Sequence, residues 1–223
     1  MCGRFTLVTD AETLQKALEL GEVPELEPRF NIAPTQDVAV VTDPKSRNVE
    51  MFRWGLVPGW AKDLSIGNRL INARAETVAE KPAFRSAFGR RRCLVLADGF
   101  YEWRKPKDKK GSSQPFYFRL ESGEPFAFAG LWEVWRKGEE DELFTCTIIT
   151  GPANERVEPI HSRQPIIIPP TSLWQWLDPE ASTEALQSLL VPIDADELVG
   201  YPVSALVNDP SHEMPELIES VAI

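Results

Sequence analysis

The sequence is poor in cysteine and histidine, the residues that most often bind zinc in proteins. Its 223 residues include three cysteines, Cys2, Cys93 and Cys146, and two histidines. The cysteine count is odd and no pair has Cys-x-x-Cys spacing, which excludes a disulfide framework and a zinc knuckle. We therefore expect neither a metal nor a cofactor.

Long apolar runs are also missing. No run approaches the roughly 18 apolar residues of a membrane-spanning helix. The opening segment Met1-Cys2-Gly3-Arg4 lacks the apolar core of a secretory signal. We expect a cytoplasmic protein with no membrane partner.

Glycine is scarcer than proline, with 13 glycines against 19 prolines. This ratio favours many short elements joined by stiff turns over long helices. The 43% hydrophobic share is typical of a globular chain, and the length is sufficient for a sizeable core. We predict a single domain, residues 1–223, that acts as a monomer.

The middle of the chain contains runs rich in β-branched and aromatic residues, each of which predicts a strand. They are residues 38–42, 49–54, 93–97, 100–104, 115–120, 126–131, 144–150 and 166–168. Short helices are predicted near residues 9–21, 77–88, 171–177 and 182–190, the first with Thr9 and Glu12 at capping-box spacing and a stop at Gly21. The pattern predicts the α+β class, with a curved, largely antiparallel sheet as core and short flanking helices.

The net charge of −10 argues at first sight against a nucleic-acid partner. The charge is unevenly distributed, however. Residues 171–223 contain ten acids and no Lys or Arg, whereas residues 81–110 contain ten bases and three acids. A polyanionic partner remains compatible with the sequence if the acidic C-terminal region, which we expect to pack as part of the domain, faces away from the positive groups.

Cys2 is the residue with the most distinctive chemistry. Removal of Met1 would leave an α-amine and a thiol on one residue, and such a 1,2-aminothiol condenses with an aldehyde to an imine and then closes a thiazolidine ring. The amine and thiol have ordinary pKa values of about 7.7 to 8.0 and 8.5, so a modest environment activates either. The alternative is an ordinary second residue with an uninvolved thiol.

Five further segments accompany the one that contains Cys2, in a defined order. The chain opens with Met1-Cys2-Gly3-Arg4-Phe5 and continues with Phe30-Asn31-Ile32-Ala33-Pro34, Arg53-Trp54-Gly55-Leu56-Val57-Pro58-Gly59-Trp60, Ile71-Asn72-Ala73-Arg74-Ala75-Glu76-Thr77, Leu96-Ala97-Asp98-Gly99-Phe100-Tyr101-Glu102-Trp103 and Ile160-His161-Ser162-Arg163-Gln164-Pro165. This order resembles the SOS response-associated peptidase (SRAP) family over residues 1 to about 208. The resemblance implies a single α+β domain that shields abasic sites in single-stranded DNA through a covalent bond to the N-terminal cysteine. It also implies that the peptidase activity removes the N-terminal residue or residues of the protein itself, which exposes that cysteine.

The resemblance also implies roles for individual residues. It makes Cys2 the nucleophile, Asn72 the side chain that orients the sugar or the N-terminus, and Glu102 and His161 the groups that move protons. Such groups are needed because ring opening of the sugar and dehydration to the imine both require proton transfer. A carboxyl flanked by Tyr101 and Trp103 would have a raised pKa.

Single-stranded DNA requires cations for its phosphates and aromatic faces for its bases. Arg4, Arg74 and Arg163 lie beside the implied catalytic residues in sequence and are candidate phosphate contacts. Pro34 and Trp103 resemble family positions that stack on bases next to the lesion, and Trp60 is a candidate for the edge of the channel. If the source is bacterial, the resemblance implies association with the nucleoid when DNA is bound.

Each residue also has a structural explanation. Glu102 could be a solvent-facing strand residue, His161 a structural histidine, and Asn72 the cap of a helix that begins near Arg74. Ser162 replaces the aspartate that many relatives carry beside the histidine, which leaves the role of His161 open. The whole chain could alternatively be an N-terminal-nucleophile cysteine peptidase acting on proteins, or a non-covalent module that binds modified bases or DNA structures.

Overall fold

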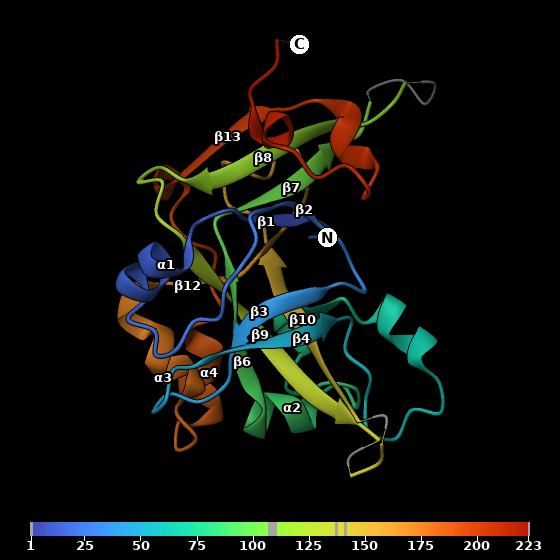
Figure 1. Ribbon diagram of the computed structural model, residues 1–223, viewed down its shortest axis with the longest axis vertical. Coiled ribbons are helices and arrows are strands. Elements are labelled where there is room, and N and C mark those ends of the chain that lie inside the picture. The colour runs from blue at the N-terminus through green and yellow to red at the C-terminus, as the bar shows by residue number, and fades with distance from the viewer. Residues whose placement is uncertain (1, 107–110, 137, 141, 223) are drawn as a thin grey trace.

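Two β-sheets form the frame of the computed structural model, which describes residues 2–106, 111–136, 138–140 and 142–222. The smaller sheet lies uppermost in Figure 1 and has the order β13-β8-β7-β1-β2. Its strands are β13 (Leu198–Pro202), β8 (Gln114–Leu120), β7 (Gly99–Arg104), β1 (Phe5–Leu7) and β2 (Arg29–Ile32). Every pair in it is antiparallel.

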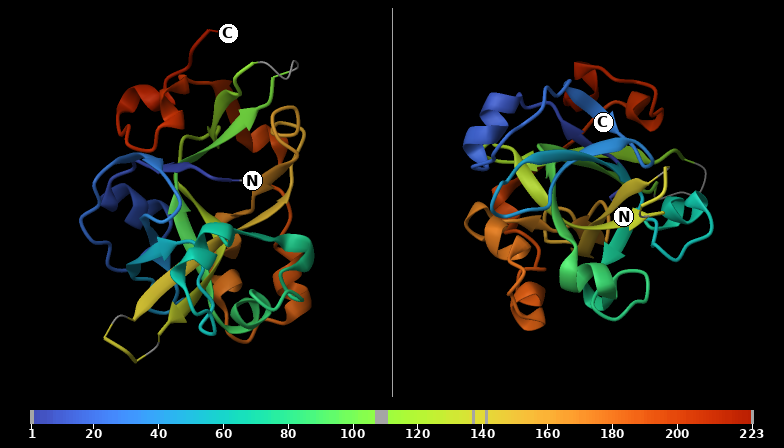
Figure 2. Two further views of the ribbon diagram at one scale, coloured as in Figure 1. Left: turned by 90° about the vertical axis from the view of Figure 1, so that its right-hand side faces the viewer. Right: turned by 60° about the horizontal axis from the view of Figure 1, so that its bottom comes forward.

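The larger sheet has the order β11-β10-β4-β3-β6-β9-β12, with β5 also paired to β10. Its strands are β11 (Arg163–Pro165), β10 (Leu143–Pro152), β4 (Val49–Trp54), β3 (Asp37–Val41), β6 (Arg92–Ala97), β9 (Phe126–Trp135), β12 (Ile167–Ile168) and β5 (Asn72–Arg74). Because β10 also pairs with β9, the path from β10 through β4, β3, β6 and β9 returns to β10 and closes a barrel. The strands surround a common centre in the right-hand view of Figure 2.

The helices are short and lie around the barrel. They are α1 (Ala11–Ala17), α2 (Arg85–Arg90), α3 (Leu173–Leu177) and α4 (Thr183–Ser188), with 3-10 turns η1 (Leu64–Arg69), η2 (Ala75–Thr77), η3 (Pro170–Ser172), η4 (Ala195–Glu197), η5 (Ala205–Asn208) and η6 (Pro215–Ile218). In Figure 1, α1, α3 and α4 lie on the left and α2 below the barrel. In the part of the chain that the structure describes, no helix has the length and apolar character needed to cross a membrane.

The predicted α+β class and largely antiparallel core are confirmed, and each predicted strand overlaps an observed one. Two details of the first helix were wrong. Asp10 rather than Thr9 is its N-cap, accepting from the Thr13 N–H, and the helix ends at Ala17 with Leu18 as its C-cap, before Gly21. The helix predicted near residues 77–88 shrinks to Arg85–Arg90, since Pro82 disfavours helical backbone at the residue before it.

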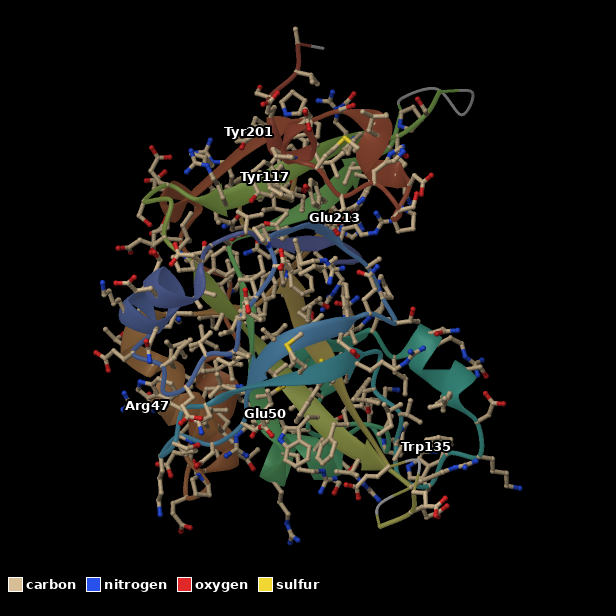
Figure 3. All side chains as sticks on the ribbon, in the orientation of Figure 1. Arg47, Glu50, Tyr117, Trp135, Tyr201 and Glu213 are labelled. Atoms are coloured by element: carbon tan, nitrogen blue, oxygen red, sulfur yellow. The ribbon has the colours of Figure 1, made fainter. Side chains whose placement is uncertain are left out.

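The acidic C-terminal region packs on the domain. β13 extends the smaller sheet, and the segment from residue 205 to residue 218, here called the C-terminal strap, covers the outer face of that sheet. A second apolar cluster lies beneath the strap, with Tyr117 and Tyr201 side by side in Figure 3. The strap also reaches β2, where the Glu213 carboxylate accepts the N–H groups of Phe30 and Asn31. Part of the acidic region therefore contacts the same end of the molecule as Arg4.

Arg92 shows that the basic run near residue 90 is not all surface. It is 5% exposed, and its guanidinium donates to the carbonyls of Phe88, Trp176 and Asp178 at 2.6 to 2.9 Å. This side chain joins α2 and α3 to the barrel, so it belongs to the structure rather than to a DNA surface.

Replacing Arg92 with Met should therefore destabilise the fold. The substitution leaves buried carbonyl oxygens without donors, at about 1–3 kcal/mol for each, so we expect a loss of roughly 2–4 kcal/mol in the free energy of unfolding, measured with urea. Arg90→Met is the matched control because Arg90 is exposed on α2, and its effect should stay within about 0.5 kcal/mol. Equal losses for the two variants would contradict the structural role of Arg92.

Candidate active site

The N-terminal segment is held against β7. β1 pairs with β7 so that Phe5 lies opposite Phe100, and one step further the Tyr101 N–H donates to the Arg4 carbonyl at 3.0 Å. Continuation of this antiparallel register places Glu102 beside the residues that precede Arg4. Cys2 and Glu102, 100 residues apart in sequence, are thus brought together by strand pairing.

Cys2 is fully buried, and its thiol is free. Asn72, at the start of β5, donates from Nδ2 to the Cys2 carbonyl at 2.8 Å, while the Cys2 Sγ lies 3.8 Å from the Arg4 carbonyl. Asn72 does not cap a helix. The N-cap position of η2 is occupied by Arg74, whose side chain makes no capping hydrogen bond. The Asn72 Oδ1 atom is buried and has no hydrogen-bond partner within the described residues. Residue 1, whose removal the sequence predicts, lies outside them.

Glu102 is 2% exposed, so it is not a solvent-facing strand residue. Burial raises the pKa of its carboxyl above the ordinary value, and the nearby His161 opposes that rise. The Cys2 thiol also has a raised pKa, first because it is buried and second because Glu102 contributes negative charge. The site therefore favours a neutral thiol next to a carboxyl that holds its proton more tightly than usual.

The expected cause of the Glu102 shift needs one correction. Tyr101 and Trp103 flank Glu102 in sequence, but side chains alternate along a strand, and both aromatics pack in the second cluster beneath the C-terminal strap. Tyr101 donates its hydroxyl to the Phe30 carbonyl at 2.8 Å, on that side of the sheet. The carboxyl is therefore desolvated on the opposite face of the sheet, where Phe100 and Cys2 pack in the main core.

His161 precedes β11 and lies next to Glu102. Its Nδ1 atom is 3.8 Å from the Glu102 Oε2 atom, and the main-chain oxygen and nitrogen of Arg163 lie 3.0 and 3.1 Å from the same Nδ1. The imidazole is about a quarter exposed. The structure thus brings Cys2, Asn72, Glu102 and His161 into one cluster.

The candidate phosphate contacts are in different states. Arg74 is exposed, whereas Arg163 is paired in bidentate fashion with Glu76. Arg4 donates to Asn31 Oδ1 and to the Val207 carbonyl at 2.6 and 2.7 Å. Arg4 is therefore fixed between β2 and the C-terminal strap, and phosphate binding by it stays a prediction.

Asn72 is one of the residues that line a groove of about 480 Å³. Trp60, Arg74 and Thr150 also line it, and Trp60 is 65% exposed. The remaining lining residues are Arg69, Leu70, Thr77, Lys81, Pro82, Ala83 and Phe84. Sequence reasoning did not single out Arg69, Lys81 or Thr150, because each is an ordinary residue until the fold places it beside Asn72.

Pro34 and Trp103 lie outside this groove. Pro34 is half-buried in the turn between β2 and β3, just before Thr35, whose φ is +76°. Trp103 is half-buried and donates from Nε1 to the Asn208 side chain at 2.7 Å. Stacking on bases by these two residues stays a prediction. Among the described residues, no group of three or more His, Cys, Asp or Glu side chains could hold a metal ion.

Comparison with known proteins shows the family of the chain. The family model described as SOS response associated peptidase (SRAP) matches residues 1–210. The chain belongs to the SRAP family. It is 45% identical over 227 residues to abasic site processing protein YoqW of Bacillus subtilis, covering 99% of this chain and 100% of the relative. It is 30% identical over 233 residues to abasic site processing protein YedK of Escherichia coli, again covering 99% and 100%.

A solved structure shares this fold. A crystal structure of a protein from Bacteroides thetaiotaomicron superposes with a TM-score of 0.86 at 26% identity, covering 99% of this chain and 100% of that one. Nearly the whole chain, including β13, is therefore part of a fold already seen by experiment.

The buried carboxyl predicts a pH-dependent stability. Because the pKa of Glu102 is raised on folding, the folded state binds this proton more tightly than the unfolded chain, and ionisation of Glu102 reduces stability as the pH rises above about 4.3. Glu102→Gln should be more stable than the parent at pH 7, and this advantage should shrink towards pH 4. Urea unfolding between pH 4 and pH 8 measures the difference. A difference that does not change with pH would contradict the raised pKa.

Proposed function

We propose that this protein processes abasic sites in single-stranded DNA by forming a covalent bond through Cys2, which shields the lesion during the DNA damage response. The names of its relatives support abasic-site processing. One observation supports the covalent step: Cys2 is buried beside the buried carboxyl of Glu102, and its carbonyl accepts a hydrogen bond from Asn72.

The proposed condensation of the Cys2 aminothiol with the sugar aldehyde releases one water molecule. After hydrolysis of the Met1–Cys2 peptide bond, the neutral Cys2 amine attacks C1′ of the ring-opened sugar, and the aldehyde oxygen takes a proton to give a carbinolamine. Acid-assisted loss of that hydroxyl as water leaves a protonated imine. The thiol sulfur then bonds to C1′, its proton is removed by a base, and the electron pair of the C=N bond returns to nitrogen. The product is a thiazolidine.

Glu102 is suited to both kinds of proton transfer. Its raised pKa leaves a larger protonated fraction to donate to the departing hydroxyl, and the resulting carboxylate can accept the thiol proton. That second transfer is needed because the Cys2 thiol has a raised pKa and is neutral at pH 7. These steps use the α-amine and side chains of this protein, and the proposal includes no cofactor.

Asn72 and His161 have complementary roles in the proposal. Asn72 fixes the Cys2 main chain through Nδ2, which leaves its buried Oδ1 to accept a hydrogen bond from the carbinolamine or a sugar hydroxyl. His161, partly exposed beside Glu102, is placed to exchange protons with the sugar oxygen. We propose that the peptidase step is limited to the protein's own N-terminus.

The groove that Asn72 helps to line is the proposed path for the DNA strand. Arg74, Arg69 and Lys81 are exposed cations on its walls, and Trp60 offers an exposed aromatic face. This combination of cations and an aromatic face suits single-stranded DNA. We propose that the protein acts there as a monomer.

Intact mass spectrometry of the protein, alone and with an abasic oligonucleotide, tests the proposal. The parent should lack Met1 and gain the oligonucleotide mass less one water. Cys2→Ala should yield only a reducible imine, because alanine supplies the amine without a thiol. Cys146→Ala is the control, since its thiol is equally buried but lies in the barrel strand β10, and it should form the adduct like the parent.

Three results would contradict the proposal. The first is a hydrolysis-resistant adduct from Cys2→Ala, and the second is adduct formation by protein that retains Met1. The third is binding of the oligonucleotide without any mass gain, which would favour a non-covalent module. Cleavage of unrelated peptides by the parent and not by Cys2→Ala would favour the general cysteine peptidase.

A further inference from the structure

Glu76 holds Arg163 by a two-point ion pair. Glu76 lies on η2, just after the strand that carries Asn72, and its Oε1 and Oε2 atoms accept from Nη1 and Nη2 of Arg163 at 2.8 and 3.0 Å. These hydrogen bonds lower the pKa of the Glu76 carboxyl. The planar two-point geometry is the same one by which arginine binds phosphate.

The other donors of Arg163 are directed at β10. Nη2 donates to the Thr150 carbonyl at 2.6 Å, and Nε and Nη2 both lie 3.4 Å from the Thr150 Oγ1 atom. A guanidinium has five N–H groups, and these contacts engage the Nε–H, both Nη2–H groups and one Nη1–H. One N–H is left, so a phosphate can gain two-point contact with Arg163 only by displacing one of these partners. Thr150 is fully buried, whereas the Glu76 side chain is partly exposed, so Glu76 is the partner that a phosphate can displace.

The Arg163 side chain spans the active-site strands. β5 and β11 both pair with β10, and Thr150 is opposite Arg74 in one pair and Pro165 in the other. Arg163 therefore reaches from β11 across Thr150 to the turn that follows β5. Thr150 lines the groove together with Asn72, and Arg163 donates to the Thr150 carbonyl, so the ion pair lies beside the proposed DNA path.

We infer that Glu76 is a built-in competitor of DNA phosphate for Arg163, which weakens non-covalent binding of undamaged strands. This inference rests on the proposed function. The Arg163 side chain is 16% exposed and the Glu76 side chain 45%, so the pair is open to solvent mainly at Glu76. A partly solvated pair contributes only about 0–1 kcal/mol, so a phosphate can replace Glu76. Once displaced, the carboxylate adds negative charge next to the polyanion, which opposes binding further.

Weak initial binding suits a protein that captures its target covalently. An undamaged strand has no aldehyde and is released, whereas an abasic strand is retained by the bond to Cys2. Glu76 acts on this selectivity through Arg163, so it is a positioning residue, and its removal should change binding far more than the chemical step.

Glu76→Gln tests the inference, with Glu12→Gln as the matched control. Glu12 accepts from Lys16 at 2.5 Å in an exposed pair on α1, so its substitution makes the same change in net charge away from the groove. Relative to that control, Glu76→Gln should bind an undamaged single-stranded oligonucleotide about 3- to 5-fold more tightly at low salt. The slope of log K against log salt should become steeper by about 0.7, the value for one additional phosphate contact. The adduct-forming rate at saturating abasic DNA should stay within about 2-fold of the parent.

A second arm uses inorganic pyrophosphate, detected through the Arg163 Nε–H signal by NMR. Glu76→Gln should bind it more tightly than Glu12→Gln does. Oligonucleotide affinity equal to or below that of Glu12→Gln would overturn the inference and make Glu76 a support for Arg163. If the parent forms no adduct while Glu76→Gln still gains pyrophosphate affinity, the proposed function fails and the competition for Arg163 stands.

Discussion

β1 joins the two sheets, and the position of the N-terminus depends on it. The strand pairs with β2 on one side and β7 on the other, while its Phe5 ring packs against Trp54 and Phe128 in the barrel at centroid distances of 5.2 and 5.7 Å. Full burial of such a side chain contributes about 1.5–3 kcal/mol. Asp98 secures the far end of the strand by accepting from the Thr6 hydroxyl and from the main chain of Val8 and Thr9.

This anchoring explains how a residue at the very start of the chain comes to be buried. Terminal residues are usually poorly ordered unless strand pairing or docking holds them. Here the pairing register continues up to Arg4, and Asn72 holds the Cys2 carbonyl from a separate strand. Burial then sets the electrostatics, since both the Cys2 thiol and the Glu102 carboxyl have raised pKa values. A carboxyl kept in such a position costs stability, which is the usual trade between stability and activity.

Much of the fold could be predicted from local sequence pattern. The strands of the barrel are five or more residues long and rich in β-branched or aromatic residues, and these were found. β1, β5 and β11 have three residues each, too few for a period to be visible, and two of them carry Asn72 and Arg163. β2 and β13 were missed because each is short and is interrupted by a residue that is depleted in strands, Asn31 in β2 and Gly200 in β13.

The candidate catalytic residues were predictable from their motifs, but their neighbours were not. The sequence around Arg163 does not indicate that its guanidinium donates a hydrogen bond to Glu76, 87 residues earlier. The sequence around Arg4 likewise does not indicate that its guanidinium donates a hydrogen bond to the C-terminal strap, 203 residues later. Such pairs depend on strand order, and the mean charge of a segment does not reveal them. Part of the acidic C-terminal region also stabilises the fold, since the Glu213 carboxylate accepts main-chain N–H groups of β2.

In the proposed mechanism, the buried Glu102 carboxyl moves the protons of adduct formation. Single-turnover rates of adduct formation at saturating abasic DNA, measured from pH 5 to pH 9 for the parent and Glu102→Gln, test this role. We expect the variant to react about 10²- to 10⁴-fold more slowly near neutral pH and to lose the pH dependence that the carboxyl imposes. A variant that reacts at the parent rate across this pH range would contradict the proton-transfer role and leave Glu102 with a structural one.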